Sequence, residues 1–155
     1  MSIKSIDQLV AEVPVFEGMR PQDLELIAGC GSTARFDSGA YIFREGDGAD
    51  VFYALRKGTV ALELFVPPHR PVTIETLHEG ELLGWSWLFS PYKWTFSARA
   101  VEPVGAIAFD AACLRGKCQS NHELGYELMT RFAGVMMRRL QATRVRLLDV
   151  YGSRG

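Results

Sequence analysis

The pattern of hydrophobic and polar positions divides the 155 residues of the chain into three segments. Residues 4–30 carry two short helical patterns, and the second opens at Pro21, a favourable first position of a helix. Residues 33–109 instead form short β-type runs separated by turn residues such as Lys57-Gly58. Beyond Phe109 the helical pattern returns. We therefore expect a mainly β fold, a barrel, roll or sandwich, with helices at both ends.

Two helices are expected after the strands. Asp110 can cap a short helix over residues 111–117. Ser120 and Glu123 have the spacing of a capping box, in which each side chain accepts a hydrogen bond from a free backbone amide. A long helix over about residues 121–149 follows.

The long helix carries two apolar stripes, which a helix needs only if it packs on two surfaces. One stripe is suited to closing onto the strands and consists of Leu124, Leu128, Phe132 and Val135. The other steps alternately by four and three, as in a coiled-coil seam, and consists of Met129, Ala133, Met136, Leu140, Thr143, Leu147 and Val150. We expect this seam to be the interface of a homodimer. The alternative is one broad stripe packed within a single chain.

Composition narrows the class of protein. The chain is 48% hydrophobic and 23% charged, which predicts one globular domain spanning residues 1–155. Its formal net charge of -1 gives no reason to expect nucleic acid or an anionic membrane as a partner. The N-terminal segment lacks the pattern of a signal peptide, and no stretch approaches the roughly 18 apolar residues of a membrane span. We expect a cytoplasmic protein.

Candidate chemistry is sparse. Cys30, Cys113 and Cys118 are odd in number and lack zinc-type spacing, which favours a reducing cytoplasm and thiols that are buried or idle. The three histidines share no ligand spacing, so we expect no metal or haem. No nucleophile elbow, Walker loop or pair of catalytic carboxylates stands in a suitable context. We expect no catalytic residue, no cofactor and no enzyme activity.

A family resemblance comes from residues 39–47, with the sequence GAYIFREGD, followed by Phe52-Tyr53-Ala54-Leu55 and Gly58-Thr59-Val60. This segment closely resembles the front of cyclic-nucleotide-binding domains, the sensor domains of catabolite-activator-type (Crp/Fnr-like) regulators. The resemblance covers about residues 13–151. It implies a β-roll, which is a double-stranded β-helix similar to a jelly roll, over residues 31–109. It also implies N-terminal helices in residues 1–30 and C-terminal helices in residues 110–151.

In that family the ligand lies against a phosphate-binding cassette, a glycine turn that leads into a short helix with free amides. The matching cassette here is residues 80–89, GELLGWSWLF. The resemblance implies a glutamate for the ribose after the glycine, and an arginine for the cyclic phosphate before a threonine or serine. This chain has Trp85 after Gly84 and Trp94 before Thr95.

Both anchoring residues are therefore absent. A charge-assisted hydrogen bond is worth roughly 1.5–3 kcal/mol. We expect cyclic-nucleotide affinity to be weakened by on the order of a hundredfold or more.

Residues 85–96, which we call the aromatic segment, contain Trp85, Trp87, Phe89, Tyr92, Trp94 and Phe96. Three hypotheses stay open for it. Its indoles fill the pocket, or a planar or apolar anion stacks on indole and binds the backbone amides, or cyclic nucleotide binds weakly through Thr95 and those amides. The candidate ligand-binding residues are Leu83, Gly84, Trp85, Ser86, Trp87, Leu88, Trp94, Thr95 and Thr143.

Thr143 enters this set because residues 138–143, RRLQAT, resemble the dimer helix of catabolite-activator-type regulators, where a threonine reaches the purine. The alternative is a small polar residue in a dimer seam. Residues 147–152 resemble the hinge into a DNA-binding domain, but the chain ends at Gly155, so we expect no direct contact with nucleic acid.

The resemblance as a whole implies a stand-alone regulatory sensor with a homodimeric state and a protein partner. The alternatives are a pseudo-sensor used for dimerisation or protein interaction, a weak cyclic-nucleotide-binding regulator, and the sensor fragment of a transcription regulator.

Overall fold

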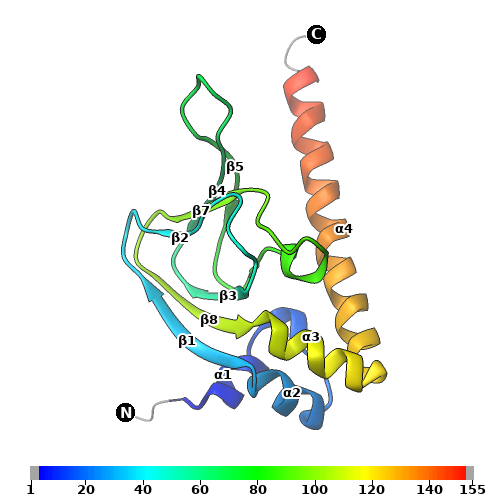
Figure 1. The fold of residues 1–155 in the computed structure, drawn as a ribbon. Helices are drawn as coiled ribbons and strands as arrows, with labels where there is room; N and C mark the ends of the chain where they lie inside the picture. Colours follow the sequence, from blue (N-terminus) through cyan, green and yellow to red (C-terminus); the bar gives the residue numbers. More distant parts are fainter. Residues whose placement is uncertain (1–3, 153–155) are drawn as a thin grey trace.

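The computed structural model describes residues 4–152, and its strands form two four-stranded antiparallel sheets that make a β-roll (Figure 1). One sheet has the order β1 (Gly31–Phe36), β8 (Val104–Asp110), β3 (Val51–Lys57) and β6 (Leu82–Leu83). The other has the order β2 (Tyr41–Phe43), β7 (Ser97–Ala100), β4 (Val60–Leu64) and β5 (Val72–Leu77). The expected mainly β fold with helices at both ends is confirmed.

The N-terminal helices lie below one end of the roll (Figure 1) and are α1 (Ile6–Ala11), η1 (Pro14–Phe16) and α2 (Pro21–Ala28). A capping box starts α1, in which the Ser5 hydroxyl accepts from the Gln8 amide and the Gln8 side chain accepts from the Ser5 amide. Pro21 begins α2, as predicted from the sequence. Ile27 is buried on its inner face.

The C-terminal helices are α3 (Ala111–Ser120) and α4 (His122–Gly152). The Asp110 carboxylate accepts a hydrogen bond from the Cys113 amide at 2.9 Å, which confirms the expected cap of α3. The capping box predicted at Ser120 is wrong, because Ser120 still belongs to α3. The residue between the helices is Asn121, whose side-chain oxygen accepts from the Leu124 amide at 3.1 Å. Within residues 4–152, no helix combines the length and apolar character that crossing a membrane requires.

An aromatic cluster lies at the centre of the core. The Phe52 ring stacks on Trp87 on one side and on Phe109 on the other, with ring centroids 4.2 and 4.9 Å apart. Phe132 of α4 meets the Trp87 ring edge to face at 5.7 Å. The first apolar stripe of α4 packs here as expected, since Leu124, Leu128 and Phe132 are buried and Val135 is partly buried.

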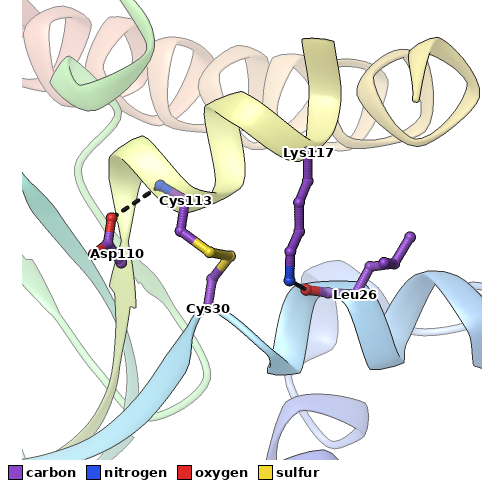
Figure 2. The surroundings of a disulfide bond; sticks show 5 residues. All are labelled: Leu26, Cys30, Asp110, Cys113 and Lys117. Atoms are coloured by element: carbon purple, nitrogen blue, oxygen red, sulfur yellow. Dashed lines mark hydrogen bonds between the residues drawn. A yellow bond between two sulfur atoms is a disulfide. The ribbon is translucent and has the colours of Figure 1, made fainter. Parts of the chain in front are cut away.

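A disulfide joins Cys30 to Cys113 (Figure 2), which corrects the prediction that these cysteines are idle thiols. Cys30 directly precedes β1, and Cys113 lies in the first turns of α3. In the β1–β8 register Gly31 pairs with Phe109, so the strand pairing brings together two cysteines that are 83 residues apart. Cys118 is a free thiol, and burial raises its pKa.

Candidate functional site

The aromatic segment leaves the roll after β6 and returns to it at β7. Gly84 makes the turn out of β6 with φ +84°, a left-handed conformation that glycine adopts without steric cost. The single-turn helix η2 (Ser86–Leu88) follows. This is the glycine turn and short helix predicted from the sequence.

Trp94 fills the space against the glycine turn. Its side chain is only 3% exposed, and its ring stacks on Phe43 with centroids 3.8 Å apart and planes 6° apart. A Cβ atom on Gly84 would lie 2.2 Å from the Trp94 ring, so the indole rests directly on the backbone of the turn. Main-chain hydrogen bonds fix the residue, because the Trp94 amide donates to the Asp47 carbonyl and the Gly46 amide donates to the Trp94 carbonyl.

Trp87 lies in the core. It is 1% exposed and belongs to the aromatic cluster with Phe52 and Phe132. The Leu88 amide donates to the Trp85 carbonyl at 3.0 Å within the short helix, so it is already hydrogen-bonded. Two of the backbone and side-chain groups expected to hold a ligand therefore serve the fold.

Trp85 differs from the other two tryptophans because it is only partly buried. The Arg139 guanidinium of α4 lies 5.1 Å from the centroid of its ring, in a cation–π arrangement. Arg139 also donates to the Leu82 carbonyl, and its Nε lies 3.9 Å from Glu75 Oε1. Burial lowers the pKa of Arg139, while Glu75 and Glu81 act in the opposite direction. Arg139 thus connects α4 to the start of the aromatic segment.

Arg115 of α3 holds the other side of the segment. It donates a hydrogen bond to the Trp87 carbonyl at 2.6 Å, and its guanidinium lies 4.2 Å from the centroid of the Tyr92 ring. Tyr92 has φ 55°, an unusual conformation for a residue with a side chain. Sequence reasoning missed Arg115 and Arg139. The only available signal was the position of Arg139 four residues after Val135, on the inner face of α4.

The remaining predicted residues are not gathered around Trp94. Thr95 is exposed. Thr143 is also exposed, and its hydroxyl donates to the Arg139 carbonyl within α4. Leu83 is buried in β6, and Ser86 is partly buried in the short helix. The structure therefore buries Leu83, Gly84, Trp87 and Trp94 in the interior of the roll and leaves Thr143 on the surface.

The predicted seam of α4 faces away from the roll. Met136 is partly buried, while the other seam residues are exposed: Met129, Ala133, Leu140, Thr143, Leu147 and Val150. The C-terminal half of α4 rises beside the β4–β5 hairpin (Figure 1), and Arg146 donates to the Ile74 carbonyl of β5. Met136 also packs against the core, whereas the other six positions are exposed, and the homodimer stays a prediction. In the part of the chain that the structure describes, no group of three or more histidine, cysteine or carboxylate side chains could hold a metal ion.

Comparisons with known proteins give a consistent result. The family model described as "Cyclic nucleotide-binding domain" matches residues 33–121. A putative cyclic nucleotide-binding protein from Geobacter metallireducens has 31% sequence identity and a TM-score of 0.77, over 89% of this chain and 99% of that one. The DNR structure from Pseudomonas aeruginosa, at 22% identity and a TM-score of 0.73, covers 94% of this chain and 65% of that one and shows the same fold.

Curated relatives are longer than this chain. The anaerobic regulatory protein of Bacillus subtilis is 22% identical over 149 residues, which cover 90% of this chain and 62% of that protein. A cAMP-dependent protein kinase regulatory subunit from Emericella nidulans is 36% identical over 52 residues, or 34% of this chain and 13% of that protein. The chain thus spans less than two thirds of the curated relatives that it matches.

Proposed function

Because this chain belongs to the cyclic nucleotide-binding domain family, we propose that it is a regulatory domain that does not bind a cyclic nucleotide in the usual way. The carrying observation is the position of Trp94. Its buried indole stacks on Phe43 and rests on the Gly84 turn. In the family the ligand lies at this turn, so here the protein's own side chain takes the ligand's place.

Two effects weaken the binding of a nucleotide at this turn. A ligand at the turn must displace the Trp94 ring, and losing the packing of a buried tryptophan costs about 3–5 kcal/mol. The ligand would then meet no arginine or glutamate, because those two positions hold Trp94 and Trp85. Since about 1.4 kcal/mol corresponds to a tenfold change in affinity, each of the two effects alone weakens binding severely.

The proposed output is assembly. With the pocket filled, the domain acts through α4, whose seam forms a homodimer and whose exposed end contacts a protein partner. The heptad spacing and exposure of the seam support this, as does the burial of the first stripe, which leaves the seam side of the helix outward. Cytoplasmic location and lack of catalytic activity stay predictions from the sequence.

Tryptophan fluorescence tests the filled pocket directly, because all three tryptophans lie in the aromatic segment. We expect no change in emission when cyclic AMP, cyclic GMP or a cell extract is added to the protein. Saturable binding of either nucleotide in the micromolar range, confirmed by calorimetry, would contradict the proposal.

A pair of variants tests the assignment of the two positions. The double substitution Trp85→Glu and Trp94→Arg restores both anchors and is expected to raise cyclic-nucleotide affinity at least tenfold, measured by calorimetry. Trp94→Phe is the matched control, since it keeps an aromatic ring against Phe43 and is expected to bind nothing. If the double variant keeps its circular dichroism spectrum and gains no affinity, these residues do not occupy the anchor positions.

A further inference from the structure

One short helix, α3, connects three parts of the molecule. On one side it meets the N-terminal helices, where Cys113 is bonded to Cys30 and the Lys117 ammonium donates to the Leu26 carbonyl at 2.7 Å (Figure 2). Two residues after Cys113, Arg115 holds the carbonyl of Trp87 and stacks on Tyr92. The disulfide and the contacts of Arg115 with the aromatic segment thus come from the same turn of α3.

α3 also packs against the start of α4. At Gly125 an added Cβ would lie 3.3 Å from the Cys118 Cβ atom, so the two helices approach closely there. A movement of α3 would therefore change the packing of the first turns of α4, which we call the base of α4.

An open cavity of about 410 Å³ leaves α3 room to move. Its walls come from the aromatic segment, α3 and α4, and include Trp87, Arg115, Cys118, Tyr126 and Met129. Met129 is the first residue of the predicted seam. A shift of α3 therefore changes both the support of the short helix η2 and the surroundings of the seam's first residue.

The disulfide is the covalent restraint on this arrangement. Cys113 is partly exposed and Cys30 is buried, so we expect an external thiol to attack at Cys113. Once the bond is broken, noncovalent contacts such as Lys117 with Leu26 and the buried Leu114 side chain still hold α3. Local opening of one helix needs less free energy than global unfolding, so a reduced protein can keep its roll while α3 loosens.

We infer that Cys30 and Cys113 form a redox-sensitive clamp on α3, and that their thiol–disulfide state alters the aromatic segment and the base of α4. This rests on the proposed function, since a domain whose ligand site is filled needs another input. The Arg115 side chain is the positioning residue that carries the change from α3 to the segment.

The reaction is exchange with a dithiol. A reductant thiolate attacks the Cys113 sulfur, the sulfur–sulfur bond breaks, and the Cys30 sulfur leaves with the electron pair and takes up a proton. The second reductant thiol then displaces Cys113. The dithiol becomes a disulfide, and two electrons and two protons pass to the cysteine pair.

The test compares the oxidised protein with the same protein reduced by dithiothreitol. We expect reduction to raise amide hydrogen exchange several-fold in the aromatic segment and in residues 122–132. Strand amides of the roll that exchange by local fluctuation, and not by global unfolding, should stay unchanged. Tryptophan emission should shift, and oxidised glutathione should reverse all of these effects. Cys113→Ser should behave like the reduced protein in either condition. Cys118→Ser is the matched control and should respond like the parent chain.

Two further variants separate a switch from a simple cross-link. Arg115→Gln should loosen the aromatic segment in both redox states and remove the difference between them. Leu77→Ala, a buried position in β5 away from α3, lowers stability without touching the clamp. If reduction raises exchange uniformly as Leu77→Ala does, or changes nothing, or if the oxidised protein titrates three free thiols, the inference is wrong. Nucleotide binding by the parent chain would refute only the proposed function.

Discussion

Trp94 and Gly84 depend on each other at the level of single atoms. The indole can rest on the turn only because residue 84 has no side chain, and the turn itself needs a positive φ. An arginine at position 94 would lie in an apolar site beside Phe43 with no ligand phosphate to pair with, which is costly. The indole of Trp94 fills this apolar site and needs no ligand there.

A double-mutant cycle measures this dependence. We expect Gly84→Ala to lower the free energy of unfolding by well over 1 kcal/mol, since it adds a clash with the Trp94 ring to the backbone strain. Combined with Trp94→Ala, the loss should be clearly smaller than the sum of the two single losses. Urea unfolding followed by circular dichroism gives all values.

Gly46→Ala is the control for backbone strain alone. Gly46 has φ +92° but open space around its Cα, so its substitution should cost only the conformational part. Equal losses at Gly46 and Gly84 would show that the contact with Trp94 contributes nothing.

The positions of Trp85 and Trp94 could be predicted from the sequence because they stand at fixed offsets from a glycine turn. Arg115 and Arg139 could not, because their contacts depend on how α3 and α4 pack on the aromatic segment. Trp87 was assigned to the ligand site, yet it stacks on Phe52 in the core, since sequence spacing does not say which way a residue on a single-turn helix points.

At the scale of elements, α4 is where the sequence pattern was most informative. Its first stripe is buried as expected, and the helix ends at Gly152, three residues later than predicted. Its start was misjudged because Ser120 and Asn121 are both good capping residues, and only the conformation of the chain between two helices decides between them.

The seam gives a prediction for the whole helix. Leu140→Glu with Leu147→Glu places two carboxylates at exposed seam positions and should turn a dimer into a monomer, measured by sedimentation equilibrium. Helix content should not fall. Val145→Glu is the matched control, because Val145 is equally exposed but lies on the opposite face of the heptad. A parent chain that sediments as a monomer, or a double variant that stays dimeric, contradicts the predicted interface.

At the scale of the whole molecule, the order of helices and strands followed from hydrophobic spacing and turn residues, whereas the disulfide did not. It depends on the β1–β8 register, which joins Gly31 to Phe109 across about half of the chain. No local pattern carries that information, and an odd number of cysteines argued against any pair.

A covalent link across 83 residues restricts the unfolded chain strongly. We expect reduction, or Cys113→Ser, to lower the free energy of unfolding by about 2–4 kcal/mol, measured by urea unfolding with and without dithiothreitol. Cys118→Ser should leave the difference between the two conditions intact. A difference below about 0.5 kcal/mol in the parent chain would show that the link does not constrain unfolding, since surface substitutions alone reach that size.

The close fit of the Trp94 ring on Gly84 also bears on evolution. Restoring an arginine at position 94 by a single substitution places a charge without a counterion in an apolar site. We expect that variant to be less stable than the starting protein, because the buried site of Trp94 is apolar. Single substitutions therefore do not readily restore a nucleotide-binding site, so the filled pocket should persist once it has evolved.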